Sequence, residues 1–120
     1  MNPVGLSVAL VVFGLWAWSV AAAPLSRDYA ESHIGETATV CGVVASAEYE
    51  PNEGSQLTLL DLGKPFPNAI FTVMIHGIDR AKFGTPENPL RGEQICVTGL
   101  ISAYQGKPVI VLIDPSQLSQ

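Results

Sequence analysis

Residues 94–113 read QICVTGLISAYQGKPVIVLI, and this stretch decides the fold. Apolar and β-branched residues lie on both sides of Gln105-Gly106, a dipeptide that favours a tight hairpin turn. The stretch therefore predicts two antiparallel strands, Gln94–Tyr104 and Lys107–Ile113. Gly99 lies inside the first of them, and a glycine within a strand allows the sharp bend that a small barrel needs.

Three further β-rich stretches precede the hairpin, and segments rich in proline and glycine separate them. They are residues 37–49, 56–62 and 70–76. In the first stretch, Val40, Gly42 and Val44 alternate with Cys41 and Val43, so the two sets are expected on opposite faces of a strand.

Little helix is predicted. Ser26 is a suitable N-cap for a short helix over residues 26–34, and Gly35 is suited to end it. One further helical turn is expected over residues 78–83. The chain is therefore all-β, and five short strands in one small domain favour a closed five-stranded barrel with a short N-terminal helix.

An apolar segment precedes this domain. Residues 4–23 carry no charged side chain and end in small residues, which is typical of a secretory signal peptide. The run is also long enough to cross a bilayer as an uncleaved anchor. We expect a signal peptide or anchor over residues 1–22 and one domain over residues 23–120. In either case the domain is exported, periplasmic or secreted, and it contacts the membrane only if residues 4–23 stay uncleaved.

Charge and cysteine content restrict the function. All six basic and all eleven acidic residues follow the apolar segment, so the domain has a net charge of −5. This sign opposes the binding of a polyanion by bulk electrostatics. Cys41 and Cys96 are the two cysteines, and an even pair in an oxidising compartment favours one disulfide, with two free thiols as the alternative.

No catalytic set is apparent. His33 and His76 are the two histidines, and neither they nor the cysteines have the spacing of metal ligands. His33 is expected to pack against the barrel, His76 to be a solvated strand-end residue, and Asp61 to serve turn or strand-end hydrogen bonding. We expect no metal, no cofactor and no enzymatic activity.

Several spaced motifs resemble a known family. They are AxxHIGE (30–36), VCGxV (40–44), LDLGKPFPN (60–68), FTVMI (71–75), VTGxI (97–101), YxGKPxI (104–110) and DPSQ (114–117). Together they are similar to the small bacterial OB-fold domains that occur alone in exported proteins or appended to secreted nucleases, and that are often labelled nucleic-acid-binding. The resemblance implies a five-stranded OB-type barrel, and it says little about function.

The resemblance also implies where the cysteines lie. The first and fourth strands of an OB barrel are antiparallel neighbours, which places Cys41 and Cys96 on adjacent strands with both side chains outward. A disulfide between them is therefore expected. The family pattern has charged residues at these two positions, so this departure slightly weakens a basic binding face.

OB folds present ligands on the face around strands two and three and on the adjoining loops. Single-stranded nucleic acid would need flat rings for its bases and cations for its phosphates. The ligand-binding candidates are Tyr49, Phe66, His76 and Tyr104 among the rings, and Lys64, Arg80, Lys82 and Lys107 among the cations. Two alternatives stay open: Phe66 plugs one end of the barrel, and Arg80 and Lys82 belong to a solvated turn.

Two functions of different classes follow. The first is a non-enzymatic binding module of the cell envelope or exterior, with an envelope protein, a glycan or a small molecule as its ligand. The alternative is a single-stranded nucleic-acid-binding OB-fold protein, which the net charge opposes.

Overall fold

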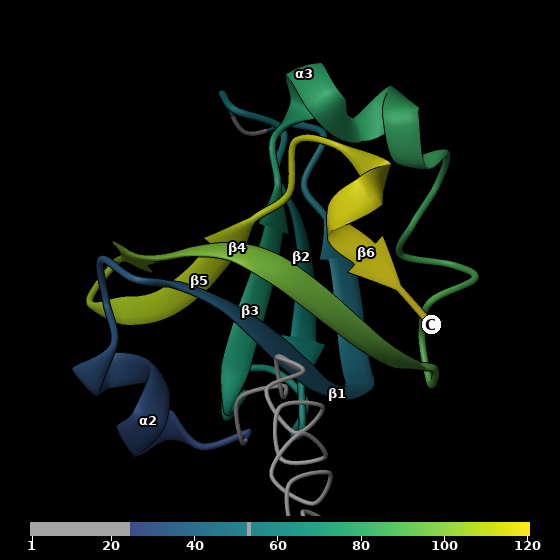
Figure 1. Ribbon diagram of the computed structural model, residues 1–120. Coiled ribbons are helices and arrows are strands. Elements are labelled where there is room, and N and C mark those ends of the chain that lie inside the picture. Colours follow the sequence, from purple (N-terminus) through teal and green to yellow (C-terminus); the bar gives the residue numbers. More distant parts are fainter. Residues whose placement is uncertain (1–24, 53) are drawn as a thin grey trace, which may run out of the picture.

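The computed structural model describes residues 25–52 and 54–120 (Figure 1). The predicted signal peptide or anchor, residues 1–22, lies outside the described residues. Within the described part of the chain, no helix has both the length and the apolar character that crossing a membrane requires.

The described chain is mostly β, as predicted. Its elements are α2 (Arg27–Ser32), β1 (Thr37–Tyr49), β2 (Thr58–Leu62), β3 (Phe71–Ile75), α3 (Gly77–Arg80), η3 (Ala81–Phe83), β4 (Gln94–Tyr104), β5 (Lys107–Val111), η4 (Pro115–Gln117) and β6 (Leu118–Ser119). The bounds of β1 and β4 are those expected. β5 ends two residues early, because the amide of Ile113 donates to Gln117 Oε1 at 2.8 Å. The short strand β6 was not predicted.

Five strands form a closed ring. The strand order is β1-β2-β3-β5-β4, and β4 pairs back with β1. All these pairings are antiparallel except the parallel pair of β3 and β5. β4 and the first half of β1 pass in front of β2 and β3 in Figure 1. β1 pairs with β4 along its first half and with β2 along its second half, and β4 pairs first with β1 and then with β5. Because each pairs with two neighbours in succession, these two strands are longer than the others.

Apolar side chains at alternate positions along the strands fill the interior of the ring. Val40 and Val44 are buried while Val43, between them on the opposite face, is 45% exposed. Leu60 and Val73, from the next two strands, have no exposed surface. The predicted faces of β1 are therefore confirmed. Apolar side chains of this kind, once removed from water, supply most of the stabilisation of a small domain.

Gly99 has a role beyond the predicted bend. A β-carbon at this position would lie 3.0 Å from a methyl group of Ile110 and 3.1 Å from Gln117 Nε2. Gln117 also donates to the carbonyl of Thr98 at 3.0 Å. The glycine therefore leaves room for the C-terminal turn to lie against β4.

Helix α2 begins as expected. Ser26 Oγ accepts from the amide of Tyr29 at 3.2 Å, and Gly35 follows the helix with φ of 98°. Ala30 is buried in the core. His33 stacks on Tyr29 within the helix, with ring centroids 3.9 Å apart, so its packing partner is the helix itself.

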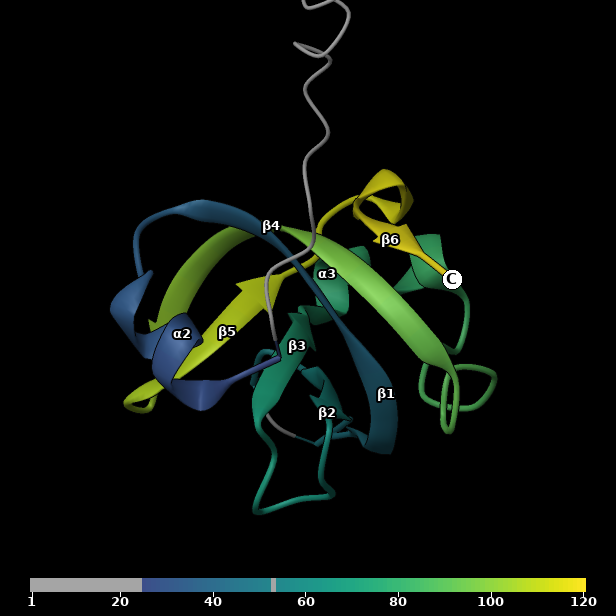
Figure 2. The same ribbon diagram turned by 60° about the horizontal axis from the view of Figure 1, so that its bottom comes forward.

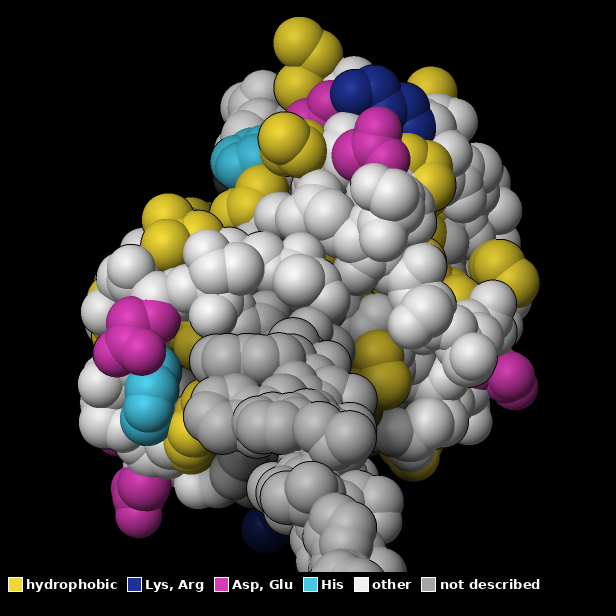
Figure 3. Space-filling model, viewed as in Figure 1, with side chains coloured by type: hydrophobic (Ala, Val, Ile, Leu, Met, Phe, Trp, Pro, Cys, Tyr) yellow, Lys and Arg dark blue, Asp and Glu magenta, His cyan; other side chains and the backbone are white. Residues whose placement is uncertain are grey.

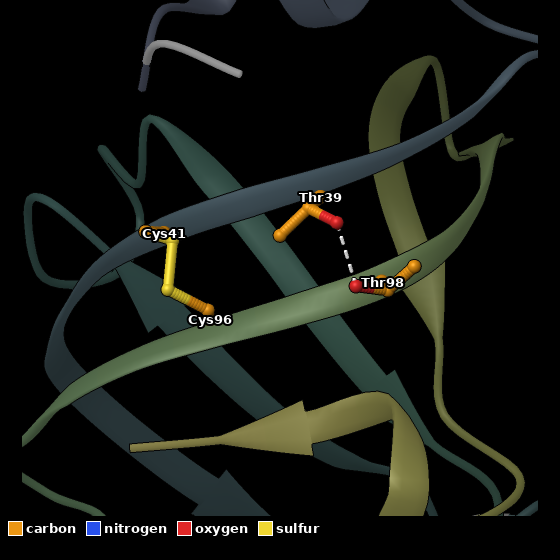
Figure 4. Close-up of a disulfide and its surroundings, with 4 residues drawn as sticks. All are labelled: Thr39, Cys41, Cys96 and Thr98. Atoms are coloured by element: carbon orange, nitrogen blue, oxygen red, sulfur yellow. Dashed lines mark hydrogen bonds between the residues drawn. A yellow bond between two sulfur atoms is a disulfide. The ribbon is translucent and has the colours of Figure 1, made fainter. Parts of the chain in front are cut away.

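The predicted disulfide is confirmed. Cys41 and Cys96 face each other across β1 and β4 and are joined by a bond between their sulfurs (Figure 4). Two residues along, Thr39 and Thr98 share a hydrogen bond of 2.7 Å between their hydroxyls. The pair of strands that closes the ring is therefore tied on its outer side by both contacts, and the bond fits an oxidising compartment.

Candidate functional site

A cavity borders several of the predicted residues on the outer side of β2, β3 and β5. Alternation turns Leu60 and Val73 inward, so their neighbours Leu59, Asp61 and Thr72 face outward. Those three residues line a cavity of about 70 Å³. β3 lies between β2 and β5 (Figure 2).

Three of the eight predicted residues meet at this cavity. Phe66 lines it from the loop between β2 and β3, and Tyr104 and Lys107 line it from the hairpin between β4 and β5. Phe66 is 62% exposed, so the interpretation that it plugs an end of the barrel is wrong. Tyr104 is 37% exposed. The chain thus leaves two rings and a lysine partly open to solvent around one hollow.

Asp61 is the acidic residue of the cavity. Its side chain is buried, and Ser46 Oγ donates to Oδ2 at 3.0 Å while Thr72 Oγ1 donates to Oδ1 at 3.1 Å. The hydrogen-bonding role expected for Asp61 holds, but its partners lie on the neighbouring strands β1 and β3 instead of at a turn. Sequence reasoning did not place Asp61 at the binding site.

The loop that bears Phe66 is connected to this carboxylate. The amide of Phe66 donates to Ser46 Oγ at 2.9 Å, and Ser46 in turn donates to Asp61. Because Ser46 Oγ accepts one proton, its own hydroxyl proton is directed at the carboxylate. The hydrogen bonds through Ser46 therefore link the position of the Phe66 backbone to the Asp61 carboxylate.

A second carboxyl lies beside the first. Burial raises the pKa of the Glu48 carboxyl above its ordinary value, and the nearby acidic groups of Asp61 and Glu50 act in the same direction. Glu48 Oε1 is buried and has no hydrogen-bond partner in the described chain. This edge of the face therefore concentrates negative charge.

Three other predicted residues lie apart from the cavity, around α3 and η3. The Arg80 guanidinium lies 3.7 Å above the ring of Tyr49 and forms an ion pair with Glu87. Lys82 Nζ lies 2.9 Å from Asp79 Oδ1. Figure 3 shows charged and hydrophobic side chains close together over α3. Lys82, whose side chain is 52% exposed, fits the solvated-turn interpretation. Arg80, whose side chain is 19% exposed, does not.

His76 also lies away from the cavity. It precedes α3 at the N-cap position and makes no side-chain capping hydrogen bond. It is partly exposed, as expected for a strand-end histidine. Among the described residues, no group of three or more His, Cys, Asp or Glu side chains is arranged to hold a metal ion.

The remaining cations show how little free positive charge the domain has. Arg27 and Arg91 donate to the backbone carbonyls of Ala69 and Ala47, both at 2.7 Å. Within residues 25–52 and 54–120, Lys64 alone resembles Lys107 in having no side-chain hydrogen bond or ion pair. Lys64 is two residues from Phe66 in the same loop.

Comparison with protein-family models and with curated proteins finds no match for this chain. The resemblance to exported OB-fold domains therefore stays an expectation based on the motifs, and the function is argued from the site.

Proposed function

We propose that this protein is an exported, non-enzymatic binding module of the OB type, and that it holds its ligand on the outer face of β2, β3 and β5. The strand order of the closed ring, with β3 parallel to β5 and a helical segment between β3 and β4, supports the OB assignment. The disulfide supports an oxidising compartment outside the cytoplasm.

One observation carries the binding role: an exposed ring from the β2–β3 loop and one from the end of β4 both line a cavity that also contains polar side chains. Phe66 and Tyr104 come from segments almost 40 residues apart, and both line the same hollow as Asp61. Ligand sites combine apolar walls with a few well-placed polar groups in this way. Exposed aromatic residues that pack little within their own chain are also typical contact residues for a partner.

The charge of the face favours a ligand that is not a polyanion. Asp61 and Glu48 lie at or beside the cavity, and Lys107 is its one basic lining residue. A protein, a glycan or a small molecule of the cell envelope fits such a face better than a string of phosphates does.

The test is retention of the protein on immobilised envelope material. Full-length protein exported to an oxidising compartment is passed over separate columns of envelope proteins and of envelope glycan. We expect retention on one of them, and we expect a double variant, Phe66→Ala with Tyr104→Ala, to lose it. Ile78→Ala is the matched control, because Ile78 is 89% exposed on α3 and lies outside the cavity. Retention of the double variant equal to that of wild type would refute the site.

Single-stranded nucleic acid is the second candidate. It is favoured by Lys107, which lines the cavity with Phe66 and Tyr104, and by Lys64, two residues from Phe66 in sequence; neither lysine has a side-chain partner among the described residues. Rings for base stacking and cations for phosphates are what such a ligand needs. Micromolar binding of labelled oligonucleotides that weakens with salt would establish this function, and no binding at low salt would exclude it.

A further inference from the structure

We propose that the cavity between Phe66 and Tyr104 takes the side chain of a lysine in an extended peptide, with the Asp61 carboxylate as its counter-charge. This inference rests on the proposed function, because it names the ligand of the same face. It rests on the charge, the walls and the size of the cavity.

Among the described residues, no cationic side chain pairs with the Asp61 carboxylate. Asp61 is only 3% exposed, yet its hydrogen-bond donors are two neutral hydroxyls, from Ser46 and Thr72. In the described part of the chain the ion pairs are Arg80 with Glu87 and Lys82 with Asp79, so none reaches Asp61. Buried charges in proteins are normally paired, because removal of a carboxylate from water is costly. A cation from a ligand would complete the arrangement.

The carboxylate has room to accept such a cation. Two oxygens offer about four lone-pair directions, and the two hydroxyls occupy two of them. Asp61 also lines the cavity, with 3% of its surface exposed. A charge-assisted hydrogen bond made there is stronger than one made at the surface.

The walls suit the rest of a lysine side chain. Leu59, Ala69 and Val109 supply apolar surface for the methylene stem. The rings of Phe66 and Tyr104 lie around the same hollow, where the face of an aromatic ring attracts an ammonium group. A nonpolar stem with a positive tip matches an apolar wall that leads to a carboxylate.

The size of the cavity is suited to a lysine side chain. Its volume is about 70 Å³, which corresponds to roughly five water-sized groups. A lysine side chain is a narrow chain of comparable size. A peptide can insert one such side chain while its backbone stays outside, across the exposed rings.

Lys107 gives the inference its sharpest test. Lys107 lines the same cavity, so its ammonium repels a cationic ligand and attracts a polyanion. Lys107→Met removes this charge and keeps the apolar stem. For a lysine ligand the affinity should rise, and for a nucleic acid it should fall.

The experiment titrates the full-length, oxidised protein with a blocked five-residue glycine peptide that carries one central lysine. The matched probe carries norleucine instead, which keeps the stem and lacks the charge. We expect the lysine peptide to bind about tenfold more tightly or better, because a hydrogen bond between charged groups is worth that factor. Equal affinities for the two peptides would overturn the inference.

Protein variants give a second, independent readout. Asp61→Asn should lose the preference for lysine over norleucine, whereas Glu36→Gln, which changes the same charge at an exposed position, should keep it. Because Asp61→Asn also alters two internal hydrogen bonds, Lys107→Met provides the variant that leaves them intact. Lysine-peptide affinity that falls in Lys107→Met would overturn the inference.

Two further probes identify the source of the cation and separate the two proposals. Spermidine that binds more tightly than the lysine peptide would overturn the peptide as source. An oligothymidine that binds wild type and weakens in Lys107→Met would replace the peptide by a nucleic acid. If the lysine peptide fails while envelope material still binds in a manner that depends on Phe66 and Tyr104, only this inference falls. If both fail, the proposed function falls with it.

Discussion

The cavity face and the α3 end of the molecule contain similar residues in opposite states. At the α3 end, Arg80 lies on Tyr49 and pairs with Glu87, so ring, cation and acid satisfy one another. At the cavity, Phe66 and Tyr104 are open to solvent and Asp61 has no cationic partner in the described chain. The first arrangement stabilises the fold, while the second leaves interactions available for a ligand.

Comparison of the cavity face with the α3 end shows that residue type alone does not mark a binding site in this domain. Arg80 and Lys82 are close in sequence and are the densest cationic pair, yet acidic partners neutralise both. Lys107 is isolated in the sequence, lines the cavity and has no ion-pair partner among residues 25–52 and 54–120. The two regions differ in whether their rings and charged groups remain available to a ligand after folding.

The largest expected effect comes from the scaffold that holds both regions in place. Replacing Cys41 and Cys96 together by Ala removes a crosslink between residues 55 apart in sequence. We expect a loss of about 4 kcal/mol of unfolding free energy in the chain-entropy account. Chemical denaturation measures it. Thr98→Val, which removes only the neighbouring hydroxyl contact, is the control and should cost about 1 kcal/mol. Equal midpoints for the double variant and wild type would contradict the structural role of the bond.

The second-largest loss of stability is expected from a variant that disrupts contacts at the α3 end alone. Arg80→Ala removes the ion pair and the contact with Tyr49, and it leaves the partly buried Glu87 without a cation. We expect a loss of about 2 kcal/mol in thermal or chemical unfolding. Lys82→Ala, whose side chain is 52% exposed, should cost less than about 1 kcal/mol. Ligand retention should be unchanged in both variants, and its loss in Arg80→Ala would move the site to α3.

A smaller effect concerns the acidic edge of the cavity face. The folded-state pKa of Glu48 is raised above its ordinary value of 4.5, so folding favours the protonated form. Stability should therefore fall as the pH rises from 4.5 through the raised pKa. Glu48→Gln should remove this dependence and be more stable than wild type at neutral pH. Unfolding midpoints measured from pH 4 to pH 8 test it, and a variant that is less stable at neutral pH would contradict it.

The smallest expected effect is a loss of stability as the pH falls, which is the opposite of the pH dependence expected for Glu48. Hydrogen bonds from Ser116 lower the pKa of Asp114, which caps the exposed turn η4 away from the cavity. Its contribution is complete above the ordinary carboxyl pKa and is lost as the pH falls through the lowered value. Asp114→Asn should therefore be less stable than wild type at neutral pH and should match it in strong acid. An unchanged difference across that range would show that the charge does not act.

Strand periodicity predicted the scaffold well and the site only in part. β1 and β4 have the bounds expected because alternation and flanking turn residues are local signals. β6 was missed because Leu118-Ser119 is too short to show a period. A register shift between Val44 and Ser46 brings Ser46 opposite Asp61, and this pairing is a tertiary result that no local pattern indicates.

The aromatic members of the site were predictable for the same local reasons. Phe66 lies between two prolines, which exclude it from the interior of a strand, and Tyr104 is the last residue of a strand before a tight turn. The state of the cations was not predictable, because Arg80 meets Glu87 and Tyr49 only after the chain folds. Charge pairing across loops depends on the geometry of the whole domain.

Mapping the bound surface by NMR would distinguish the cavity face from the α3 end. Isotope-labelled, full-length protein in the oxidised form is titrated with the lysine peptide and with the envelope material that retains it, and backbone amide shifts are recorded. We predict the largest changes in β2, β3 and β5 and in the loops that carry Phe66 and Tyr104. Changes centred on α3 and η3, with the cavity face unperturbed, would contradict the account.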